Sequence, residues 1–320
     1  MSIIHACMLV LAGALLIIIA RLRFKKTIKL SRFILESRGL IILRYVKAYK
    51  FLMSFFVLGY ILLVVVWFLK VELIISHLWT SVLLLASSLY IYLGVSLQFK
   101  TFMLLKNLHF ETIKALVAAI EARDSYTKGH SKHVAELMLL MHKNLPRHLK
   151  KGLSSEVIFY SGLLHDVGKI GVPGHILNKT GRLEEDEWEQ IKSHTSVGAQ
   201  ILRQINQLSG MAKWINYHHE RIDGTGYYGI TGARIPLVSK IISVADTFSA
   251  LVTDRPYRVG KSYHEALDIM KSVSGTQLDP FVLSIFLNID KDEILDVTIK
   301  YIESDTEYEN PNILLKHSNN

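Results

Sequence analysis

Five histidines and two aspartates stand in sequence contexts that set them apart from the other ionisable residues of this chain. They occur in the segments YTKGHS, LLHDVGKIG, EQIKSHTSVG, WINYHHE and IISVADTFSALV. The seven residues are His130, His165, Asp166, His194, His218, His219 and Asp246. Several adjoin apolar runs, where an unpaired ionised carboxylate is costly to bury. Imidazole and carboxylate groups in such surroundings predict a metal centre.

The donor types indicate which metals such a centre would hold. Cys7 is the only cysteine, which excludes an intrachain disulfide and a site built from several thiolates. Nitrogen and oxygen donors without sulfur suit divalent iron, manganese, zinc or nickel. Seven donors exceed the three or four of a single open catalytic site, so two ions bridged by a carboxylate are favoured. For Asp246 taken alone, a helix cap or a buried salt bridge is the alternative.

Most of the other histidines are interpreted as ordinary polar residues. The chain has 14 histidines, and neutral imidazole often serves as a solvated or capping group. His133, one helical turn after His130, is interpreted as a neighbour of the centre rather than a ligand. The residues assigned solvated or capping roles are His5, His77, His142, His148, His264 and His317.

Residues from about 111 to 288 closely resemble the HD-GYP phosphodiesterases, a branch of the HD-domain metal-dependent phosphohydrolases. The similarity runs in order through RDSYTKGHS, LLHDVGKIGVP, ILNKTGRLEEDEWEQIKSHTSVG, HHERIDGTGYYG, IPLVSKIISVADTFSALVTDRPYR and LDP. So many ordered motifs are far more specific than a lone HD dipeptide. The resemblance implies an all-helical fold and two or three transition-metal ions, usually iron. It also implies a role in bacterial signalling, the hydrolysis of cyclic di-GMP to pGpG or GMP.

The resemblance assigns roles to individual residues. One ion would be held by His130, His165, Asp166 and Asp246, and the second by Asp166, His194, His218 and His219. Asp166, as the bridge, and Lys169 of the HDxGK signature would be the catalytic residues. Lys169 would reach a phosphate oxygen with its compact charge, the alternative being a surface lysine. Arg255 and Arg258 would bind substrate, because a guanidinium fork suits phosphate and guanine.

The sequence departs from the family pattern at two points. Gly226-Tyr227-Tyr228 stands where the family has Gly-Tyr-Pro, and a proline would stiffen the turn. This change puts in doubt the rigidity of the loop and any partner recognition by it, while every ligand is retained. Tyr126 stands where some members have a glutamate that helps to hold a third metal, so two ions are expected.

Helical periodicity predicts an all-α domain after the apolar N-terminal region. Predicted helices cover 98–122, 130–145, 154–165, 184–205, 208–219, 237–253, 262–273 and 280–288. No strand pattern of useful length is present. We expect a connecting helix at 98–110, a catalytic domain at 111–290, and a C-terminal extension with a polar tail at 291–320. Trp188 is assigned to the core, and Arg221 and Asp223 to holding the loop that follows the paired histidines.

Three apolar runs in the first hundred residues predict transmembrane helices at about 3–20, 51–69 and 73–97. A cleaved signal peptide is the alternative for the first run. It would need basic residues before the run and a small-residue cleavage site after it, and neither is present. A buried core helix is the alternative for the third run, but it follows the second after only three residues. We therefore expect a membrane-anchored protein.

Basic residues predict the orientation of these spans. Residues 21–50 contain ten lysines or arginines against one acid, and the positive-inside rule places this segment in the cytoplasm. A nucleic-acid patch is the alternative, but a position between two spans favours anionic lipid headgroups. The net charge of +9 is thus mainly a membrane feature. The prediction is a multi-pass protein of the cytoplasmic membrane with its catalytic domain in the cytoplasm.

Two further classes of function stay open at this stage. One is a catalytically weak domain that binds a nucleotide or a protein partner, and the other is an HD phosphohydrolase that acts on another nucleotide. The expected partners are cyclic di-GMP, the membrane and signalling proteins bound at the loop 226–228, with no nucleic-acid polymer. A homodimer is one option that the sequence leaves open.

Overall fold

The computed structural model describes residues 3–35, 50–51, 53–62, 65, 77–124, 129–254 and 259–306. Within these ranges the structure is helical, and the only β-type pairing is an isolated bridge between Ser274 and Leu278. The all-α class predicted from the sequence is confirmed for this part of the chain. The chain divides into two compact units, Met1–Glu111 and Thr112–Asn320.

The N-terminal unit contains helix α1 (Ile3–Leu35), a short apolar helix Met53–Leu62, and the first part of helix α3 (His77–Glu121). Its core includes Ile17 and Tyr60, both fully or almost fully buried. Among the residues described, one helix, Thr80–Glu121, is long and apolar enough to cross a membrane. Much of the second predicted span and the turn after it lie outside the described residues. The three-span arrangement stays a prediction.

Two helices of this unit continue past the ends of the apolar runs. Helix α1 extends beyond the predicted span 3–20, through Arg21 and Arg23 to Leu35, because arginine and lysine are good helix formers that do not interrupt the backbone. The third apolar run and the connecting segment 98–110 are one continuous helix, α3, of 45 residues. No glycine, proline or turn sequence separates the two segments at residue 97.

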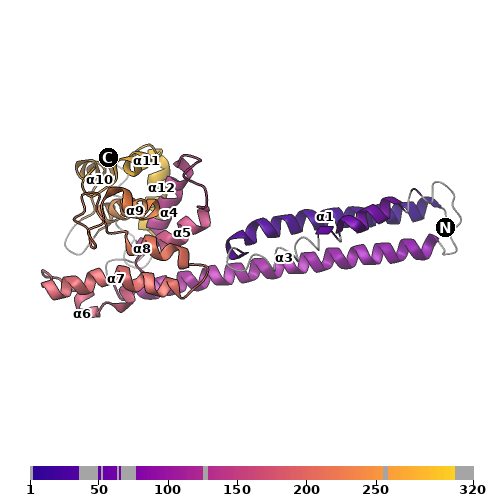
Figure 1. Cartoon of the computed structure of the whole chain (residues 1–320), viewed down its shortest axis with the longest axis horizontal. Helices are drawn as coiled ribbons and strands as arrows, with labels where there is room; N and C mark the ends of the chain where they lie inside the picture. The colour runs from indigo at the N-terminus through magenta and orange to yellow at the C-terminus, as the bar shows by residue number, and fades with distance from the viewer. Residues whose placement is uncertain are drawn as a thin grey trace. The chain divides into compact units, whose positions relative to one another are not determined.

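Besides the end of helix α3, the described part of the C-terminal unit contains eight principal helices, and all but the last follow the predicted pattern; Figure 1 shows their arrangement. They are α4 (His130–Asn144), α5 (Ser155–Leu163), α7 (Glu185–Arg203), α8 (Ala212–Asn216), α9 (Leu237–Val252), α10 (Tyr263–Ser272), α11 (Pro280–Leu287) and α12 (Lys291–Thr306). Shorter helical turns are η1 (Val167–Gly171), α6 (Gly174–Leu177), η2 (Ser209–Met211) and η3 (Gly232–Arg234). Side-chain caps begin several helices: Ser154 accepts a hydrogen bond at α5, and Ser262 and Asp279 do so at α10 and α11.

Helix α9 forms the centre of this unit and packs against α4, α5, α8, α10 and α11. Its buried residues include Ile241, Ile242 and Phe248, and the Phe248 ring lies 4.9 Å from the ring of Phe286 on α11. Full burial of such side chains contributes about 1.5–3 kcal/mol each. Because α9 is held on several sides, Asp246 on the same helix has a rigid support.

Helix α12 was not predicted, and it extends the unit beyond the predicted domain end at residue 290. It packs on α4, with Ile294 fully buried and Tyr301 6% exposed. Asp292 and Glu293 lie in its first turn, where acidic side chains interact favourably with the helix dipole. Because residues 291–306 contain many charged side chains, the narrow apolar face of this helix was not recognised in the sequence. The polar tail from 307 onward lies outside the described residues.

Two assignments of individual side chains were wrong. Trp188, expected in the core, is 43% exposed on α7, and its ring contacts Tyr227 edge to face at 6.1 Å. His142, expected to be solvated or capping, is 8% exposed, and its Nε2 lies 3.1 Å from the carbonyl oxygen of Leu153. Each aromatic ring has a specific neighbour that its local sequence could not reveal.

The turn η1 packs directly against the backbone of α7 at Gly168. A Cβ atom at this position would lie 1.8 Å from the carbonyl oxygen of His194 and 2.4 Å from the backbone nitrogen of Gly198. No side chain fits there. This close approach brings the segment carrying Asp166 and Lys169 against the helix that carries His194.

We predict that Gly168→Ala forces η1 away from α7 and lowers the free energy of unfolding by roughly 1–3 kcal/mol, as overpacking does. Urea unfolding would measure this change. Gly174→Ala is the matched control, because a Cβ atom there meets nothing within 4 Å. Equal stability of the two variants would contradict the close approach.

Candidate metal centre

Seven predicted ligands come from five parts of the fold and meet beside α9. His130 begins α4. His165 and Asp166 follow the end of α5, and His194 lies within α7. His218 and His219 lie just after α8, and Asp246 is on α9. The donor atoms form two groups whose members lie within 4.8 Å of one another. The groups are Asp166, His194, His218 and His219, and His130, His165 and Asp166.

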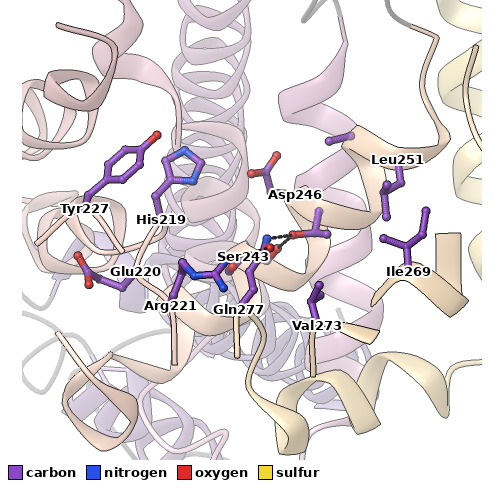
Figure 2. A pocket seen from close by; sticks show the side chains of 12 residues that line it. His219, Glu220, Arg221, Tyr227, Ser243, Asp246, Leu251, Ile269, Val273 and Gln277 are labelled. Carbon is purple, nitrogen blue, oxygen red and sulfur yellow. Dashed lines mark hydrogen bonds between the residues drawn. The ribbon is translucent and has the colours of Figure 1, made fainter. Parts of the chain in front are cut away.

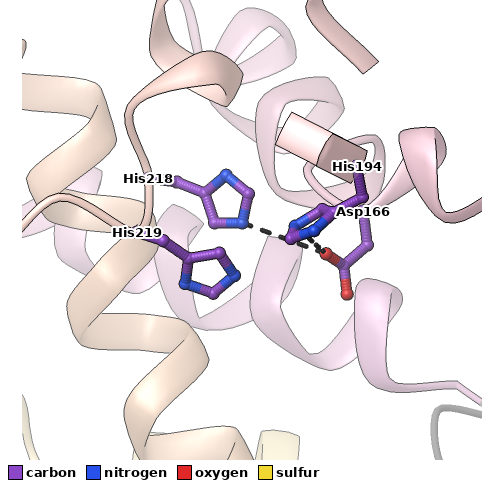
Figure 3. A group of neighbouring side chains, drawn as sticks. All are labelled: Asp166, His194, His218 and His219. Carbon is purple, nitrogen blue, oxygen red and sulfur yellow. Dashed lines mark ion pairs between the residues drawn. The ribbon is translucent and has the colours of Figure 1, made fainter. Parts of the chain in front are cut away.

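Asp166 belongs to both groups and faces them with different oxygen atoms. Its Oδ1 lies 3.3 Å from His194 Nε2 and 3.9 Å from His218 Nε2, as Figure 3 shows. Its Oδ2 lies 3.4 Å from His165 Nε2. One carboxylate thus stands between two sets of imidazoles. This is the position that a bridging ligand would occupy.

Three of these histidines have a tautomer set by the backbone. The Nδ1 atoms of His165, His194 and His218 lie 2.7, 2.6 and 2.6 Å from the carbonyl oxygens of the residues three positions earlier. A carbonyl oxygen only accepts, so each Nδ1–H donates and each Nε2 carries a lone pair. Hydrogen bonding of this kind at the far nitrogen is typical of metal-ligating histidines.

The three Nε2 atoms are buried and have no hydrogen-bond partner among the described residues. Each therefore directs a lone pair toward the Asp166 carboxylate, which is also an acceptor. Such an arrangement is unfavourable unless a cation lies between the groups. The residues present thus fit a metal ion.

Asp246 joins the centre through His130. Its Oδ1 lies 3.0 Å from His130 Nε2, although Asp246 falls outside both donor groups. His219 is partly exposed, with its ring 4.0 Å from that of His218 and 5.2 Å from that of His194. The predicted ligands are therefore contiguous, and His219 and Asp246 lie at the solvent side of the cluster.

The Lys169 ammonium lies between Asp166 and a second carboxylate, Asp124. Lys169 Nζ lies 2.8 Å from Asp166 Oδ2 and 2.9 Å from Asp124 Oδ2. Burial would raise the pKa of Asp166, but the adjacent Lys169 ammonium outweighs it and holds that pKa well below its usual range. Burial likewise opposes the charge of Lys169, but the two carboxylates raise its pKa above the ordinary value. Both groups are therefore ionised at neutral pH.

Two imidazoles of the centre, those of His218 and His219, are kept neutral. Burial, followed by the neighbouring His219, His165 and His194, holds the pKa of His218 well below its ordinary value. Burial is also the largest cause that lowers the pKa of His219 to about 4, although Asp246 acts in the opposite direction. Neutral imidazole is the form that binds a metal.

A cavity of about 410 Å³ opens beside His219 and Asp246 (Figure 2). Polar groups of Arg221, Tyr227 and Gln277 line part of it. Apolar side chains, among them Leu251, Ile269 and Val273, line another part. Lys169 does not line this cavity, and Arg255 and Arg258 lie outside the described residues.

Three acidic residues that support the centre were missed in the sequence. Asp124 pairs with Lys169, and Glu121 accepts hydrogen bonds from the backbone nitrogens of Gly129 and Ser131, both at 2.9 Å, which holds the start of α4. Glu220 is 3% exposed and accepts from the backbone around Tyr228. Proximity to the motifs was the available signal: Glu220 directly follows the paired histidines.

Tyr228 has contacts that the family proline could not make. Its backbone N–H donates to Glu220 at 2.6 Å, and its hydroxyl lies 2.6 Å from that of Thr195, the residue after His194. Proline has no N–H. Tyr227 packs against His219 with ring centres 4.8 Å apart. The two tyrosines therefore tie the loop to elements that carry the ligands.

The same loop is held by its own charged pair. Arg221 donates to Asp223 at 2.8 Å, and Asp223 accepts from the backbone nitrogen of Thr225 at 3.0 Å. Arg221 also reaches Gln277 at 3.2 Å. These contacts agree with the holding role expected for Arg221 and Asp223.

A family model described as HD domain matches residues 114–282, more than half of the 320 residues. The chain belongs to the HD-domain family. The matched part of this HD-domain protein contains all seven predicted ligands, and helix α12 lies beyond it. Membership of this family, predicted from the ordered motifs, is confirmed.

Named relatives of the HD-domain protein are cyclic-dinucleotide phosphodiesterases. The 3'3'-cGAMP-specific phosphodiesterase 3 of Vibrio cholerae is 37% identical over 170 residues, which cover 52% of this chain and 36% of that protein. A cyclic di-GMP phosphodiesterase of Thermotoga maritima is 37% identical over 202 residues, 62% of this chain and 54% of that protein. The chain thus spans between about a third and a half of the length of these curated relatives.

One solved structure with similarity to this chain is a cyclic GMP-AMP specific phosphodiesterase of Vibrio cholerae. It has 18% sequence identity and a TM-score of 0.43. The aligned part covers 62% of this chain and 54% of that chain.

The buried neutral histidines predict how stability depends on pH in metal-free protein. Burial and the nearby His130 lower the pKa of His133 to about 3, so the unfolded chain takes up a proton below pH 6.5 that the folded chain does not. Stability must then fall as pH decreases from about 6.5 to 4, by about 1.4 kcal/mol per pH unit for each such group. Asp166 and Asp246, whose pKa values are lowered, lose their contributions only below about pH 4.

His133→Gln should therefore reduce this slope by about 1.4 kcal/mol per pH unit. Urea titrations of metal-free protein at several pH values would measure it. His148→Gln is the control, since His148 is exposed. A stability that stays constant from pH 6.5 to 4 would contradict the burial of these neutral groups.

Proposed function

We propose that this protein hydrolyses a phosphodiester bond of a cyclic dinucleotide, cyclic di-GMP in the first instance, to pGpG or GMP. The observation that carries the proposal is the set of three buried Nε2 lone pairs directed at Asp166 beside an open cavity. The HD-domain membership and the names of the curated relatives support it. These names include both cyclic di-GMP and 3'3'-cGAMP, which share the cyclic dinucleotide ring and differ in one base.

The centre would hold two divalent transition-metal ions, with iron favoured and manganese, zinc or nickel as alternatives. Asp166 would bridge them, with His130, His165 and Asp246 on one side and His194, His218 and His219 on the other. Two bound metals would supply an activated water and charge neutralisation at the phosphate. A third ion is not part of the proposal, because Tyr126 stands where some members of the family have a glutamate that helps to hold it.

The residues of the cavity suit the other parts of a cyclic dinucleotide. Its size lies within the range of about 300–1,000 Å³ that is usual for small-molecule sites. The apolar surface around Leu251, Ile269 and Val273 can pack against the face of a base. Burial, then Asp166 and Asp246, raise the pKa of Tyr227 to about 12, so its hydroxyl remains a neutral donor for a phosphate oxygen.

Lys169 would act beside Asp166 rather than inside the cavity. Its ammonium contacts two carboxylates, and metal binding at Asp166 would release one of these contacts while Asp124 holds the ammonium where it can stabilise charge that develops on the phosphate. Removal of one such electrostatic contribution typically costs about 100- to 1000-fold in rate. The catalytic roles of Asp166 and Lys169 are thus separable.

We predict that the metal-loaded protein cleaves cyclic di-GMP. The variant Asp166→Ala should lose both the bound metal and turnover. The variant Lys169→Met should keep the metal but turn over about 100- to 1000-fold more slowly. Metal analysis and product chromatography would measure these effects, with 3'3'-cGAMP and linear nucleotides as further substrates. Lys179→Met is the matched control, because Lys179 pairs with Glu187 away from the cluster.

Tight binding without cleavage of any cyclic dinucleotide by fully metallated protein would instead favour the binding-module alternative. Cleavage of linear nucleotides alone would favour a phosphohydrolase of another specificity. Parent-like turnover by metal-loaded Lys169→Met would contradict the role of Lys169.

We also propose that the N-terminal region anchors the catalytic unit to the cytoplasmic membrane from the cytoplasmic side. The apolar runs at 3–20, 51–69 and 73–97 and the basic segment 21–50 support this arrangement. The apolar helix Thr80–Glu121 supports at least one span. Signalling proteins could then reach the loop 226–228, where Tyr228 is 45% exposed.

Reporter fusions test the topology directly. Fusions after residue 50 and after residue 320 should both report a cytoplasmic location, because the ten basic residues of 21–50 resist translocation. A fusion after residue 71 should report the opposite side. A periplasmic signal from either of the first two fusions would contradict the three-span arrangement.

A further inference from the structure

A row of buried polar side chains leads from the metal centre to helix α12. His130 Nδ1 lies 2.9 Å from Ser249 Oγ, which lies 2.8 Å from His133 Nδ1. His133 Nε2 lies 3.2 Å from Thr298 Oγ1 on α12. The four side chains are at most 6% exposed. None of the last three is a predicted ligand, and Thr298 lies beyond the HD match.

The hydrogen bonds of this row can all be donated in one direction, from His130 toward Ser249 and from Ser249 through His133 to Thr298. Thr298 donates its hydroxyl hydrogen to the carbonyl oxygen of Ile294 at 2.8 Å, so it accepts from His133 Nε2–H. The neutral His133 then carries no hydrogen on Nδ1, which accepts from the Ser249 hydroxyl. Ser249 in turn accepts from His130 Nδ1–H.

This direction leaves a lone pair on His130 Nε2. That atom lies 3.0 Å from Asp246 Oδ1, another acceptor. His165, His194 and His218 have the same Nδ1–H form, set by backbone carbonyls, but their Nε2 atoms have no hydrogen-bond partner, whereas His130 Nε2 has Asp246 within hydrogen-bond distance. His130 alone among the four is oriented by side chains instead.

Packing keeps His133 in the orientation that the row requires. Its ring stacks on Tyr301 of α12, with ring centres 4.6 Å apart and planes 12° from parallel. Burial and the nearby His130 lower the pKa of His133 to about 3, so the ring stays neutral and one nitrogen remains an acceptor. Helix α12 therefore supplies both a stacking partner and the terminal hydrogen-bond acceptor.

We infer that Ser249, His133 and Thr298 form a positioning relay that holds His130 as the Nδ1–H tautomer, with its Nε2 lone pair directed at the metal centre. Helix α12 thereby completes a site whose ligands all lie within the HD match. The inference rests on the metal-binding part of the proposed function and not on the identity of the nucleotide. Hydrogen-bond partners of metal-ligating histidines typically contribute 10- to 100-fold to metal affinity.

The test measures Mn²⁺ binding to the full-length protein by equilibrium dialysis and electron paramagnetic resonance, without nucleotide. Ser249→Ala should weaken one of two bound ions by about 10- to 100-fold and leave the other unchanged. Thr298→Val should weaken the same ion by about 2- to 12-fold, the equivalent of one hydrogen bond. Thr298→Ser keeps the hydroxyl and should restore parent affinity.

A double variant distinguishes a relay from separate structural effects. Once Ser249→Ala breaks the row, Thr298→Val should cause no further loss of Mn²⁺ affinity, whereas independent effects would add. His142→Gln is the matched control, since His142 is a buried histidine on the same helix α4 that contacts Leu153 instead of the row. It should leave both ions unchanged.

Several outcomes would overturn the relay. One is that Ser249→Ala binds both Mn²⁺ ions with the affinity of the unsubstituted protein, and another is that it binds both ions equally more weakly. The relay would also be overturned by additive losses of affinity in the double variant, or by evidence that His130 binds no ion in the unsubstituted protein. The proposed function fails in a different way. A parent that binds two Mn²⁺ ions with the expected variant pattern, yet cleaves no cyclic dinucleotide, would support the relay and contradict the activity.

Discussion

The C-terminal unit depends on one arrangement, in which hydrogen-bond acceptors of three imidazoles face the carboxylate of Asp166. Nε2 atoms of His165, His194 and His218 direct buried lone pairs at the Asp166 carboxylate, 3.3 to 3.9 Å away. Such a cluster is costly without a cation, because each group has left water without gaining a donor. The fold must therefore supply enough stabilisation elsewhere to hold these groups in place, and a bound metal would then stabilise the folded form.

This stabilisation comes from closely packed elements, namely the turn η1 against α7 and the central helix α9. The turn that carries Asp166 meets α7 at Gly168, where no Cβ atom fits, and α9 carries Asp246 along a helix that is packed against five others. Lys169 pairs with Asp166 from outside the group of imidazoles, and Asp124 holds the Lys169 ammonium in place. Rigid supports of this kind let a site keep a geometry that its own groups would not adopt.

Polar contacts outside the cluster then set the orientation of each ligand. Backbone carbonyls orient three imidazoles, and the row that ends at Thr298 orients His130. Glu220 and Tyr228 hold the loop after the paired histidines, so the tyrosine that replaces the family proline gains two hydrogen bonds that proline would lack. The altered tripeptide is thus accommodated by side-chain contacts instead of by a restricted backbone.

Local sequence determined the helices from α4 to α11 and the candidate donors, because helical periodicity, caps and residue chemistry are short-range properties. The starts of α4 and α10 and the seven candidate ligands could all be read in this way. The exposure of Trp188, the existence of α12, and the roles of Asp124, Glu220 and His133 could not. Each depends on a neighbour distant in sequence, such as Tyr227 for Trp188 or Thr298 for His133. Only tertiary packing decides such pairs, since a buried polar group is satisfied by whichever partner the fold brings within hydrogen-bond distance.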